Sequence, residues 1–371
     1  MSSTAKSFIE SQLSRTGVTI NGDKPWDPQV HEPALYGRLL SQGTLGLGEG
    51  YMDGWWDAEA IDQFIYRLVS ADIQANFKPD LALIGSALRG KLLNMQRLKV
   101  REVGEKHYDI GNELYAAMLD QRMIYSCGYW KDATSLDAAQ EAKLDLICRK
   151  VGLEKGMRVL DIGSGWGGFL QFAAERYGVS GVGVTISKEQ AALANERTRG
   201  LPVETRLMDY QALEGTFDRI ISIGMFEHVG YKNYRPYFTK ARQLLADDGL
   251  LLLHTIGGNS STTHGDPWSE KYIFPNGMLP SIAQIGTATE KLFVMEDWHN
   301  FGADYDKTLM AWLDRFEAAW PRLADHYDQR FHRMWRYYLA SFAAMFRARA
   351  IELWQVVLSP RGVPGGYFSV R

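Results

Sequence analysis

Short apolar runs separated by amphipathic stretches dominate the chain from residue 157 onward. The apolar run 157–162 predicts a strand, and residues 179–185, 203–207, 219–223 and 250–255 are further strand candidates. The first run is followed by a pattern that predicts a helix ending near Tyr177. Ser187, with Gln190 three residues later, forms a capping box that predicts the start of another helix. Strands that alternate with helices predict a parallel sheet covered by helices on both faces.

The stretch 258–303 interrupts this alternation. It is rich in Gly, Pro, Trp and His, which is typical of an inserted lid or pocket wall. A helical pattern then runs from about Asp306 to Arg349, and two strand-like pieces, 352–358 and 367–370, follow it. Because the sequence contains no internal repeat, we expect one large α/β domain interrupted by this insert and not a repeat array.

The N-terminal part has a different composition. Residues 1–80 predict a small, mainly helical unit, which glycines divide into short elements at positions 43, 46, 48, 50 and 54. Residues 81–100 predict a basic amphipathic linker, because seven basic residues stand against three acidic ones between positions 78 and 106. Two interpretations of the linker stay open: it docks to an anionic membrane surface, or it is a solvated helix face on the larger domain formed by 101–371.

Length and composition narrow the possible classes of protein. A chain of 371 residues is long for one compact domain, and its net charge of −3 gives no general drive toward nucleic acid. Aromatic residues make up 12% of the chain and can build a core or line an apolar ligand tunnel. The two cysteines, Cys127 and Cys148, imply neither a disulfide framework nor a paired-cysteine metal site. Without an apolar signal segment or a run of about 18 apolar residues, we expect a soluble cytoplasmic protein that meets membranes only at their surface.

The strongest local motif is the glycine-rich segment from Asp161 to Gly168, between a predicted strand and a predicted helix. Glycines let a ligand approach the backbone closely, and the helix N-terminus favours anionic groups. The spacing of Gly163, Gly165 and Gly167 does not continue as the dinucleotide pattern GxGxxG. The loop has the form associated with S-adenosylmethionine, which we favour over a nucleotide cofactor and over a simple tight turn.

The end of the second predicted strand is less informative. It reads Gly183-Val184-Thr185-Ile186-Ser187 and lacks the acidic residue that normally binds ribose hydroxyls. Thr185 and Gln190 offer polar contacts instead, but Thr185 equally well only ends a strand and Gln190 only caps a helix. The local sequence leaves both interpretations open.

Eight motifs resemble, in order and spacing, the cyclopropane-fatty-acid synthase family. They read YDIGN from Tyr108, YSCGYW from Tyr125, DIGSGWGG from Asp161, GVTISKEQ from Gly183, MFEHVG from Met225, HTIG from His254, KYIFP from Lys271 and WHNFGADY from Trp298. The match runs from about residue 100 to the C-terminus. The segment LGEGYMDGWWD at 47–57 resembles the additional domain of the branch that acts on phospholipids, which the mycolic-acid branch lacks. Relatives often carry Cys where this chain has Ser164, a loop position at which we expect no loss of function.

The resemblance implies a fold and an activity. The fold is a Rossmann-like class I methyltransferase, an α/β protein with a mostly parallel sheet, helices on both faces and an antiparallel C-terminal strand, plus a small, mainly helical N-terminal domain. The activity is S-adenosylmethionine-dependent addition of a methylene bridge across the double bond of an unsaturated acyl chain in a phospholipid. The alkene attacks the electrophilic methyl group, and the resulting carbocation needs aromatic faces, exclusion of water and a base.

The resemblance also implies that the base is a bound bicarbonate ion. Its holders would be Cys127, Glu227, His254, Tyr305 and the backbone of Ile256. Such an anion needs hydroxyl, imidazole and backbone donors, and a neighbouring Glu would orient the His or share a proton with the anion. Taken singly, each of these side chains equally fits core packing or structural hydrogen bonding. The set also suggests zinc, but the spacing offers no paired ligands and methyl transfer needs no metal, so we expect none.

Cofactor contacts follow from the same resemblance. The implied residues are Tyr125 and Ser126 at the methionine end, Gly163 and Gly165 beneath it, Thr185, Ile186 and Gln190 near the ribose, and Tyr210 and Gln211 near the adenine. On its own, Tyr210 also fits plain packing.

The implied partners are membrane phospholipids with unsaturated acyl chains, at the anionic inner face of the cytoplasmic membrane, and a second copy of the chain in a homodimer. Two alternatives differ in outcome: an acyl methyltransferase that gives a methyl-branched or methylene product, and a lipid-binding protein without catalysis. Retention of Cys127, Glu227, His254 and Tyr305 favours ring closure, and the intact glycine loop argues against lost catalysis.

Overall fold

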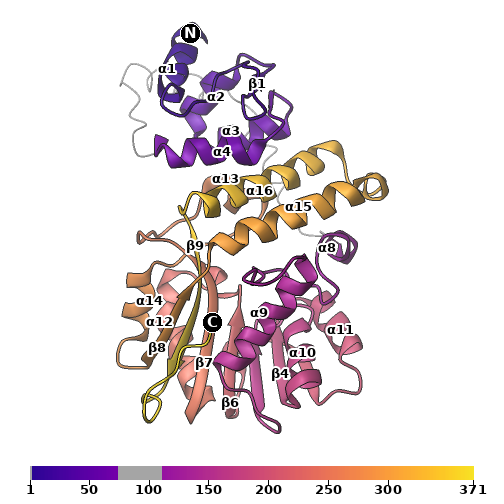
Figure 1. Ribbon diagram of the computed structural model, residues 1–371, viewed down its shortest axis with the longest axis vertical. Coiled ribbons are helices and arrows are strands. Elements are labelled where there is room, and N and C mark those ends of the chain that lie inside the picture. The colour runs from indigo at the N-terminus through magenta and orange to yellow at the C-terminus, as the bar shows by residue number, and fades with distance from the viewer. Residues whose placement is uncertain (1, 74–110) are drawn as a thin grey trace. The chain divides into compact units, whose positions relative to one another are not determined.

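The computed structural model describes residues 2–73 and 111–371 (Figure 1). The chain divides into two compact units, each built from several stretches of sequence. Unit 1 comprises Met1–Met118, Gly265–Pro275 and Leu309–Ala350, and unit 2 comprises Leu119–His264, Asn276–Thr308 and Ile351–Arg371. The predicted basic linker 81–100 lies outside the described residues, so the division of the chain at residues 80 and 100 stays a prediction.

Within the described residues, unit 2 is built around a seven-stranded sheet with the order β5-β4-β3-β6-β7-β9-β8. The strands are β3 (Arg158–Ile162), β4 (Ser180–Thr185), β5 (Val203–Leu207), β6 (Phe217–Ile223), β7 (Leu245–Gly257), β8 (Val294–Asn300) and β9 (Glu352–Ser359). Neighbouring strands from β5 to β7 pair in parallel, whereas β9 pairs antiparallel with both β7 and β8. The predicted fold class, a mostly parallel sheet with an antiparallel C-terminal strand, is confirmed.

Helices cover both faces of this sheet (Figure 1). They are α9 (Leu136–Lys150), α10 (Gly168–Tyr177), α11 (Lys188–Arg197), α12 (Tyr234–Leu244) and α14 (Ile282–Thr289), with 3-10 turns η2 (Tyr210–Ala212), η3 (Phe226–His228) and η4 (Tyr231–Asn233). Successive strand residues point to opposite faces, so Val159 packs with α9 and α10, whereas Leu160 packs with α12 and α14. Burial on both faces explains why the inner strands of the sheet are rich in apolar residues.

The stretch 258–303 holds regular elements that the sequence pattern did not predict. It contains α13 (Pro267–Tyr272), α14 and β8, and β8 is an edge strand of the main sheet. β8 carries polar and charged residues, and its first two, Val294 and Met295, are exposed, so no apolar run marks it.

The C-terminal prediction is half right. The predicted strand 352–358 corresponds to β9, but residues 367–370 form no strand. Side chains hold the tail instead: Ser369 Oγ donates to Asp297 Oδ1 at 2.9 Å, and Arg371 Nη1 lies 2.6 Å from Asp297 Oδ2. A strand would need backbone hydrogen bonds to a neighbouring strand, and the tail is held by these side-chain contacts instead.

Unit 1 is mainly helical, and beyond the predicted unit 1–80 it also includes Gly265–Pro275 and Leu309–Ala350. Its elements are α1 (Ser2–Leu13), α2 (Leu35–Gln42), α3 (Thr44–Met52), α4 (Ile61–Ser70), α8 (Asn112–Met118), α13 and α16 (Gln329–Arg347), with the short antiparallel pair β1 (Gln29–Val30) and β2 (Trp56–Asp57). Helix α15 (Ala303–Leu323) begins in unit 2 and continues in unit 1. Aromatic rings build the core, and buried Trp56 packs edge-on against Phe64 at 5.2 Å between ring centroids. Within residues 2–73 and 111–371, no helix meets the length and apolarity needed to cross a bilayer.

The sequence suggested that the glycines of the N-terminal part divide it into short elements, but not all of them end a helix. Gly43 separates α2 from α3, with φ +56°. Gly48 and Gly50 lie inside α3, where a Cβ on Gly48 would lie 2.4 Å from the Trp268 ring and one on Gly50 would lie 2.6 Å from Leu35. These inner glycines allow close packing and so build the unit instead of dividing it.

Candidate active site

The glycine loop begins where β3 ends and leads into α10. Gly163 and Gly165 have φ +85° and +51°, which favours glycine. A Cβ on Gly163 would lie 2.7 Å from Met225, whereas one on Gly165 would meet no described atom within 4 Å. Gly163 is therefore needed for packing, and Gly165 borders space in which a ligand can approach the backbone.

The next strand end carries Thr185, Ile186 and Gln190. The Thr185 hydroxyl donates to Gln190 Oε1 at 2.8 Å and accepts the Ser187 N–H at 3.2 Å. Ser187 caps α11 as predicted, but the Gln190 side chain bonds Thr185 instead of closing a capping box. Ile186 is 84% exposed just beyond β4, at the same edge of the sheet as the glycine loop, where an apolar ligand surface can cover it.

Tyr210 and Gln211 lie in η2, just after β5. Asp209 Oδ1 accepts the Gln211 N–H at 2.9 Å, and the Tyr210 ring packs edge-on against buried Tyr237 at 5.5 Å. Tyr210 is therefore held partly by packing, and the Gln211 side chain is exposed.

The segment that precedes α9 carries Cys127 and is fastened to the start of α15. The Thr308 hydroxyl accepts the Gly128 N–H at 3.1 Å and the Trp130 indole N–H at 2.9 Å. Cys127 Sγ lies 3.9 Å from the same hydroxyl oxygen. Tyr305, which is also buried, lies about one turn before Thr308 on α15. The helix therefore holds Cys127 and Tyr305 in one neighbourhood.

Cys127 is a neutral thiol in this setting. Burial raises its pKa well above the ordinary value, and the charge of Asp304 acts in the same direction. Its Sγ lies 3.1 Å from the Gly128 carbonyl oxygen, to which the thiol donates. Cys127 can therefore fill space or donate a weak hydrogen bond, but it is not set up as a thiolate nucleophile.

Glu227 presents one paired and one unpaired oxygen. It lies in η3 and its Oε1 accepts the Ile256 N–H at 2.6 Å. Oε2 is buried and has no hydrogen-bond partner among the described residues. Burial raises the pKa of Glu227 to about 7, against the opposing effect of the Ile256 hydrogen bond. Near neutral pH this carboxyl can thus donate as well as accept a proton.

His254 presents a second unpaired atom. Gln355 Nε2 lies 3.3 Å from Nδ1, and this orientation of the amide assigns the proton of the neutral ring to Nε2. Nε2 is buried without a partner in the described part of the chain. Burial lowers the pKa of His254 well below its ordinary value, and the charges of Lys143 and Lys150 add to this effect. The ring is therefore neutral and offers a buried N–H.

Phe301 contacts both groups of residues. Its ring lies 5.9 Å from the His254 ring and 5.4 Å from the Tyr129 ring, between centroids. Tyr129 follows Cys127 by two residues, and Phe301 precedes α15, which carries Tyr305. Phe301 thus connects His254, on the strand that also carries Ile256, with the segment that carries Cys127.

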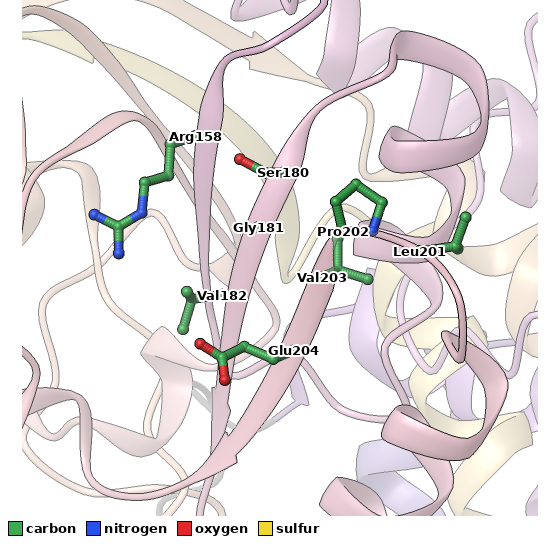
Figure 2. Close-up of a pocket in the computed structure, with 8 residues that line it drawn as sticks. All are labelled: Arg158, Ser180, Gly181, Val182, Leu201, Pro202, Val203 and Glu204. Carbon is green, nitrogen blue, oxygen red and sulfur yellow. The ribbon is translucent and has the colours of Figure 1, made fainter.

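Two other features do not compete with this site. No group of three or more His, Cys, Asp or Glu in the described ranges could hold a metal ion. A pocket of about 390 Å³ lies at the start of β3, β4 and β5 and is lined by Arg158, Ser180, Gly181, Val182, Leu201, Pro202, Val203 and Glu204 (Figure 2). It lies at the amino ends of the strands, whereas ligands of doubly wound sheets bind at the carboxyl ends.

Comparison with known proteins identifies relatives. The sequence profile of the family described as mycolic acid cyclopropane synthetase matches residues 95–356. The chain is 54% identical to the cyclopropane-fatty-acyl-phospholipid synthase of Escherichia coli (strain K12), over 97% of this chain and 94% of that protein. It is 33% identical to the tuberculostearic acid methyltransferase UfaA1 of Mycobacterium tuberculosis, over 90% of this chain and 83% of that protein. A crystal structure of mycolic acid cyclopropane synthase CmaA1 with SAH and CTAB is 33% identical, with a TM-score of 0.63 over 69% of this chain and 96% of that one.

Proposed function

This chain belongs to the mycolic acid cyclopropane synthetase family, and from that premise we propose that it transfers a methylene group from S-adenosylmethionine to the cis double bond of a phospholipid acyl chain. The product carries a cyclopropane ring. In this proposal a carbocation formed on the acyl chain loses its proton to a bound bicarbonate ion. The observation that carries the proposal is the pair of buried atoms, Glu227 Oε2 and His254 Nε2, that have no partner in the described chain.

The carboxyl edge of β3 and β4 fits S-adenosylmethionine. Gly165 leaves space next to the backbone, Ile186 offers an exposed apolar surface, and the N-terminus of α10 favours a carboxylate. When bound, the cofactor supplies an electrophilic methyl group. The residues of this edge would orient that methyl group against the alkene, and such positioning supplies a large part of the rate enhancement of two-substrate reactions.

The unpaired atoms of Glu227 and His254 fit a bicarbonate ion. When bound, that ion supplies a base for the proton of the new methyl group. The neutral His254 ring would donate its Nε2–H to the anion, and Glu227 would share a proton with it. In the structure the Ile256 N–H bonds Glu227, so in this proposal Ile256 orients the carboxyl group. Burying two polar groups without partners costs free energy, and a small polar ligand would offset that cost.

Aromatic rings next to this site suit a carbocation. Phe301 contacts the rings of His254, Tyr129 and His299, with the last at 4.9 Å between centroids. A desolvated ring face stabilises a nearby cation by roughly 2 kcal/mol. The burial of Tyr129, Phe301 and Tyr305 also excludes water, which would otherwise quench the cation.

The proposed reaction can be tested with the full chain, labelled S-adenosylmethionine and liposomes of an unsaturated phospholipid. We expect label in the acyl chain and a mass gain of one CH2 group. Because an acyl chain with a methylene branch has the same mass as the ring, NMR of the released fatty acid must identify the ring protons. Absence of label in the lipid contradicts the proposal and favours a lipid-binding protein without catalysis.

A second candidate is transfer that ends in a methyl-branched or methylene product. It is favoured by the relative that is 33% identical over 90% of this chain and is named tuberculostearic acid methyltransferase. The same NMR experiment separates the candidates, because a branched product has no ring protons. The 54% identity to a named cyclopropane-forming enzyme favours ring closure.

We also propose that the chain works as a homodimer at the inner face of the cytoplasmic membrane. Support comes from the substrate, since a phospholipid must be reached at a membrane surface. Co-sedimentation with anionic and zwitterionic vesicles at low and high salt tests the location, and light scattering tests the dimer. Equal binding to both kinds of vesicle at both salt concentrations contradicts an electrostatic attachment.

A further inference from the structure

One face of α9 fixes Ser126 through its backbone and its side chain. Gln140 and Lys143 lie one turn apart on this helix and are both fully buried. The Gln140 amide donates to the Ser126 carbonyl oxygen at 2.7 Å, and Lys143 Nζ donates to Ser126 Oγ at 2.8 Å. The Tyr129 N–H also bonds the Ala139 carbonyl oxygen at 2.8 Å. Ser126 is therefore held in one orientation by a rigid element.

Within the described part of the chain, the proton of the Ser126 hydroxyl group has no acceptor. An ammonium group only donates hydrogen bonds, so Ser126 Oγ must accept from Lys143 and its own hydrogen must point elsewhere. Lys143 Nζ is the one polar atom of the described residues that hydrogen-bonds Ser126 Oγ. The serine is only 5% exposed, so water is largely excluded from this hydroxyl group as well. The Ser126 hydroxyl group is therefore placed to donate a hydrogen bond to an acceptor on a ligand.

Lys143 forms no ion pair with the residues that the structure describes, because none of their carboxylate oxygens lies within 4.0 Å of its Nζ. Burial lowers the pKa of Lys143 to about 8, against the raising effects of Asp120, Cys127 and Asp161, so the ammonium form prevails at neutral pH. A buried, unpaired charge is costly, and a protein keeps one where a ligand supplies the opposite charge.

The position of Ser126 indicates which ligand group this is. A Cβ on Gly224, directly after β6, would lie 4.0 Å from the Ser126 Cβ. β6 pairs with β3, and the glycine loop begins at the end of β3. Ser126 therefore lies at the carboxyl edge of the sheet, beside the loop where we place the cofactor. The methionine part of S-adenosylmethionine carries a carboxylate, which would accept the Ser126 O–H and supply the charge opposite to that of Lys143.

We propose that Lys143 is a positioning residue that recognises the cofactor's carboxylate through Ser126. Lys143 holds the Ser126 hydroxyl as an acceptor, which forces its O–H toward the carboxylate, and the ammonium charge favours an anion there. This inference rests on the proposed placement of the methionine end of the cofactor at Ser126. The proposal adds Lys143 of α9 to the cofactor site, a residue that lies outside the sequence motif of the glycine loop.

The test compares S-adenosylhomocysteine with its decarboxylated analogue, by calorimetry on the full chain in bicarbonate-free buffer. In Lys143→Met, which keeps an unbranched side chain and removes the ammonium group, we expect S-adenosylhomocysteine to bind about 10- to 100-fold more weakly. The decarboxylated analogue should bind as it does to the unchanged protein. Ser126→Ala should give the same selective loss. In Ser126→Ala, adding Lys143→Met should change affinity by less than about threefold, because the lysine acts through the serine.

The outcomes separate this inference from the proposed function. If Ser126→Ala weakens binding selectively and Lys143→Met does not, the inference fails while the cofactor placement stands. If Ser126→Ala leaves both affinities unchanged, both ideas are overturned. Equal losses for the two ligands in Lys143→Met contradict carboxylate recognition and indicate a structural role. Lys143→Gln, which removes the charge but keeps an N–H donor, provides a second variant if the Met variant does not fold.

Discussion

Two buried glutamates, one in each unit, differ in how their oxygens are satisfied. Glu49 in α3 accepts from Lys271 at 2.5 Å and Tyr272 at 2.8 Å through Oε1, and from Arg38 at 2.5 Å through Oε2. Burial alone would raise its pKa, but these hydrogen bonds outweigh burial and lower the pKa. Glu227 in η3 has one backbone hydrogen bond and one bare oxygen, and burial raises its pKa to about 7.

The difference separates a structural acid from a functional one. A buried carboxylate with a full set of hydrogen-bond donors needs no ligand. Glu49 is of this kind, and its bonds to Lys271 and Tyr272 connect α3 to α13 within unit 1. A buried carboxyl with an unused oxygen, such as that of Glu227, is costly without a ligand. Both residues are buried glutamates, so it is their hydrogen-bond and ion-pair partners that tell the two roles apart.

The largest expected effect is the loss of turnover in Glu227→Ala. If Glu227 acts on the anion, kcat should fall by about 10²- to 10⁴-fold, the range of general acid–base catalysis. S-adenosylhomocysteine should bind as before, because Glu227 does not contact the cofactor in our proposal. Steady-state kinetics and calorimetry check the two parts. Turnover close to that of the unchanged protein would remove Glu227 from the mechanism.

Glu49→Ala should show the opposite pattern. It leaves Lys271 and Arg38 partly buried without their shared partner, and breaking such a pair costs about 3–5 kcal/mol of unfolding free energy. Urea unfolding measures the loss, and turnover per folded molecule should stay near that of the unchanged chain. A stable Glu49→Ala with damaged turnover would reverse the assignment of the two glutamates.

Gly165→Val should weaken cofactor binding by about 10- to 100-fold, since a side chain there fills open space beside the backbone and strains a left-handed conformation. Gly200→Val is a matched control. Gly200 also has a positive φ, at +90°, and open surroundings, but it lies in the turn after α11. Calorimetry with S-adenosylhomocysteine should separate the two variants, and equal losses would point to strain alone.

Much of the fold was predictable because of how it is buried. The inner strands β3, β4 and β6 are largely buried, so their residues form apolar runs that stand out in the sequence. The glycine loop was predictable because its backbone geometry requires glycine at Gly163 and Gly165. Strand β8 was missed because it lies in the irregular stretch 258–303 and its own residues form no apolar run.

The site was less predictable, and its supporting residues were missed. Cys127, Glu227, His254, Ile256 and Tyr305 were expected from a resemblance, and no local pattern singled them out. Thr308, Gln355 and Lys143 orient them or their neighbours, yet each lies in an ordinary helix or strand. Their roles arise from contacts between segments far apart in the sequence, such as the 180 residues between Gly128 and Thr308. Phe301, in contrast, lies within a recognised motif.

The smallest expected effect is also the sharpest test of the comparison, because pH should act on the two glutamates with different signs. The pKa of Glu227 is raised in the folded chain to about 7 from 4.5, so the folded state holds its proton longer and loses stability as pH rises. Relative to Glu227→Gln, the unchanged protein should lose about 1.4 kcal/mol of unfolding free energy between about pH 6 and 8.

The pKa of Glu49 is lowered in the folded chain, so its contribution is complete above the ordinary glutamate range and falls only in acid. The difference between the unchanged protein and Glu49→Gln should therefore be flat over the same interval. Asp161, with a pKa of about 7, titrates in the unchanged protein and in both variants. Its effect on the unfolding free energy therefore largely cancels when each variant is compared with the unchanged protein. Urea unfolding in bicarbonate-free buffer measures both, and a flat difference for Glu227→Gln would mean that its second oxygen finds a partner within the protein.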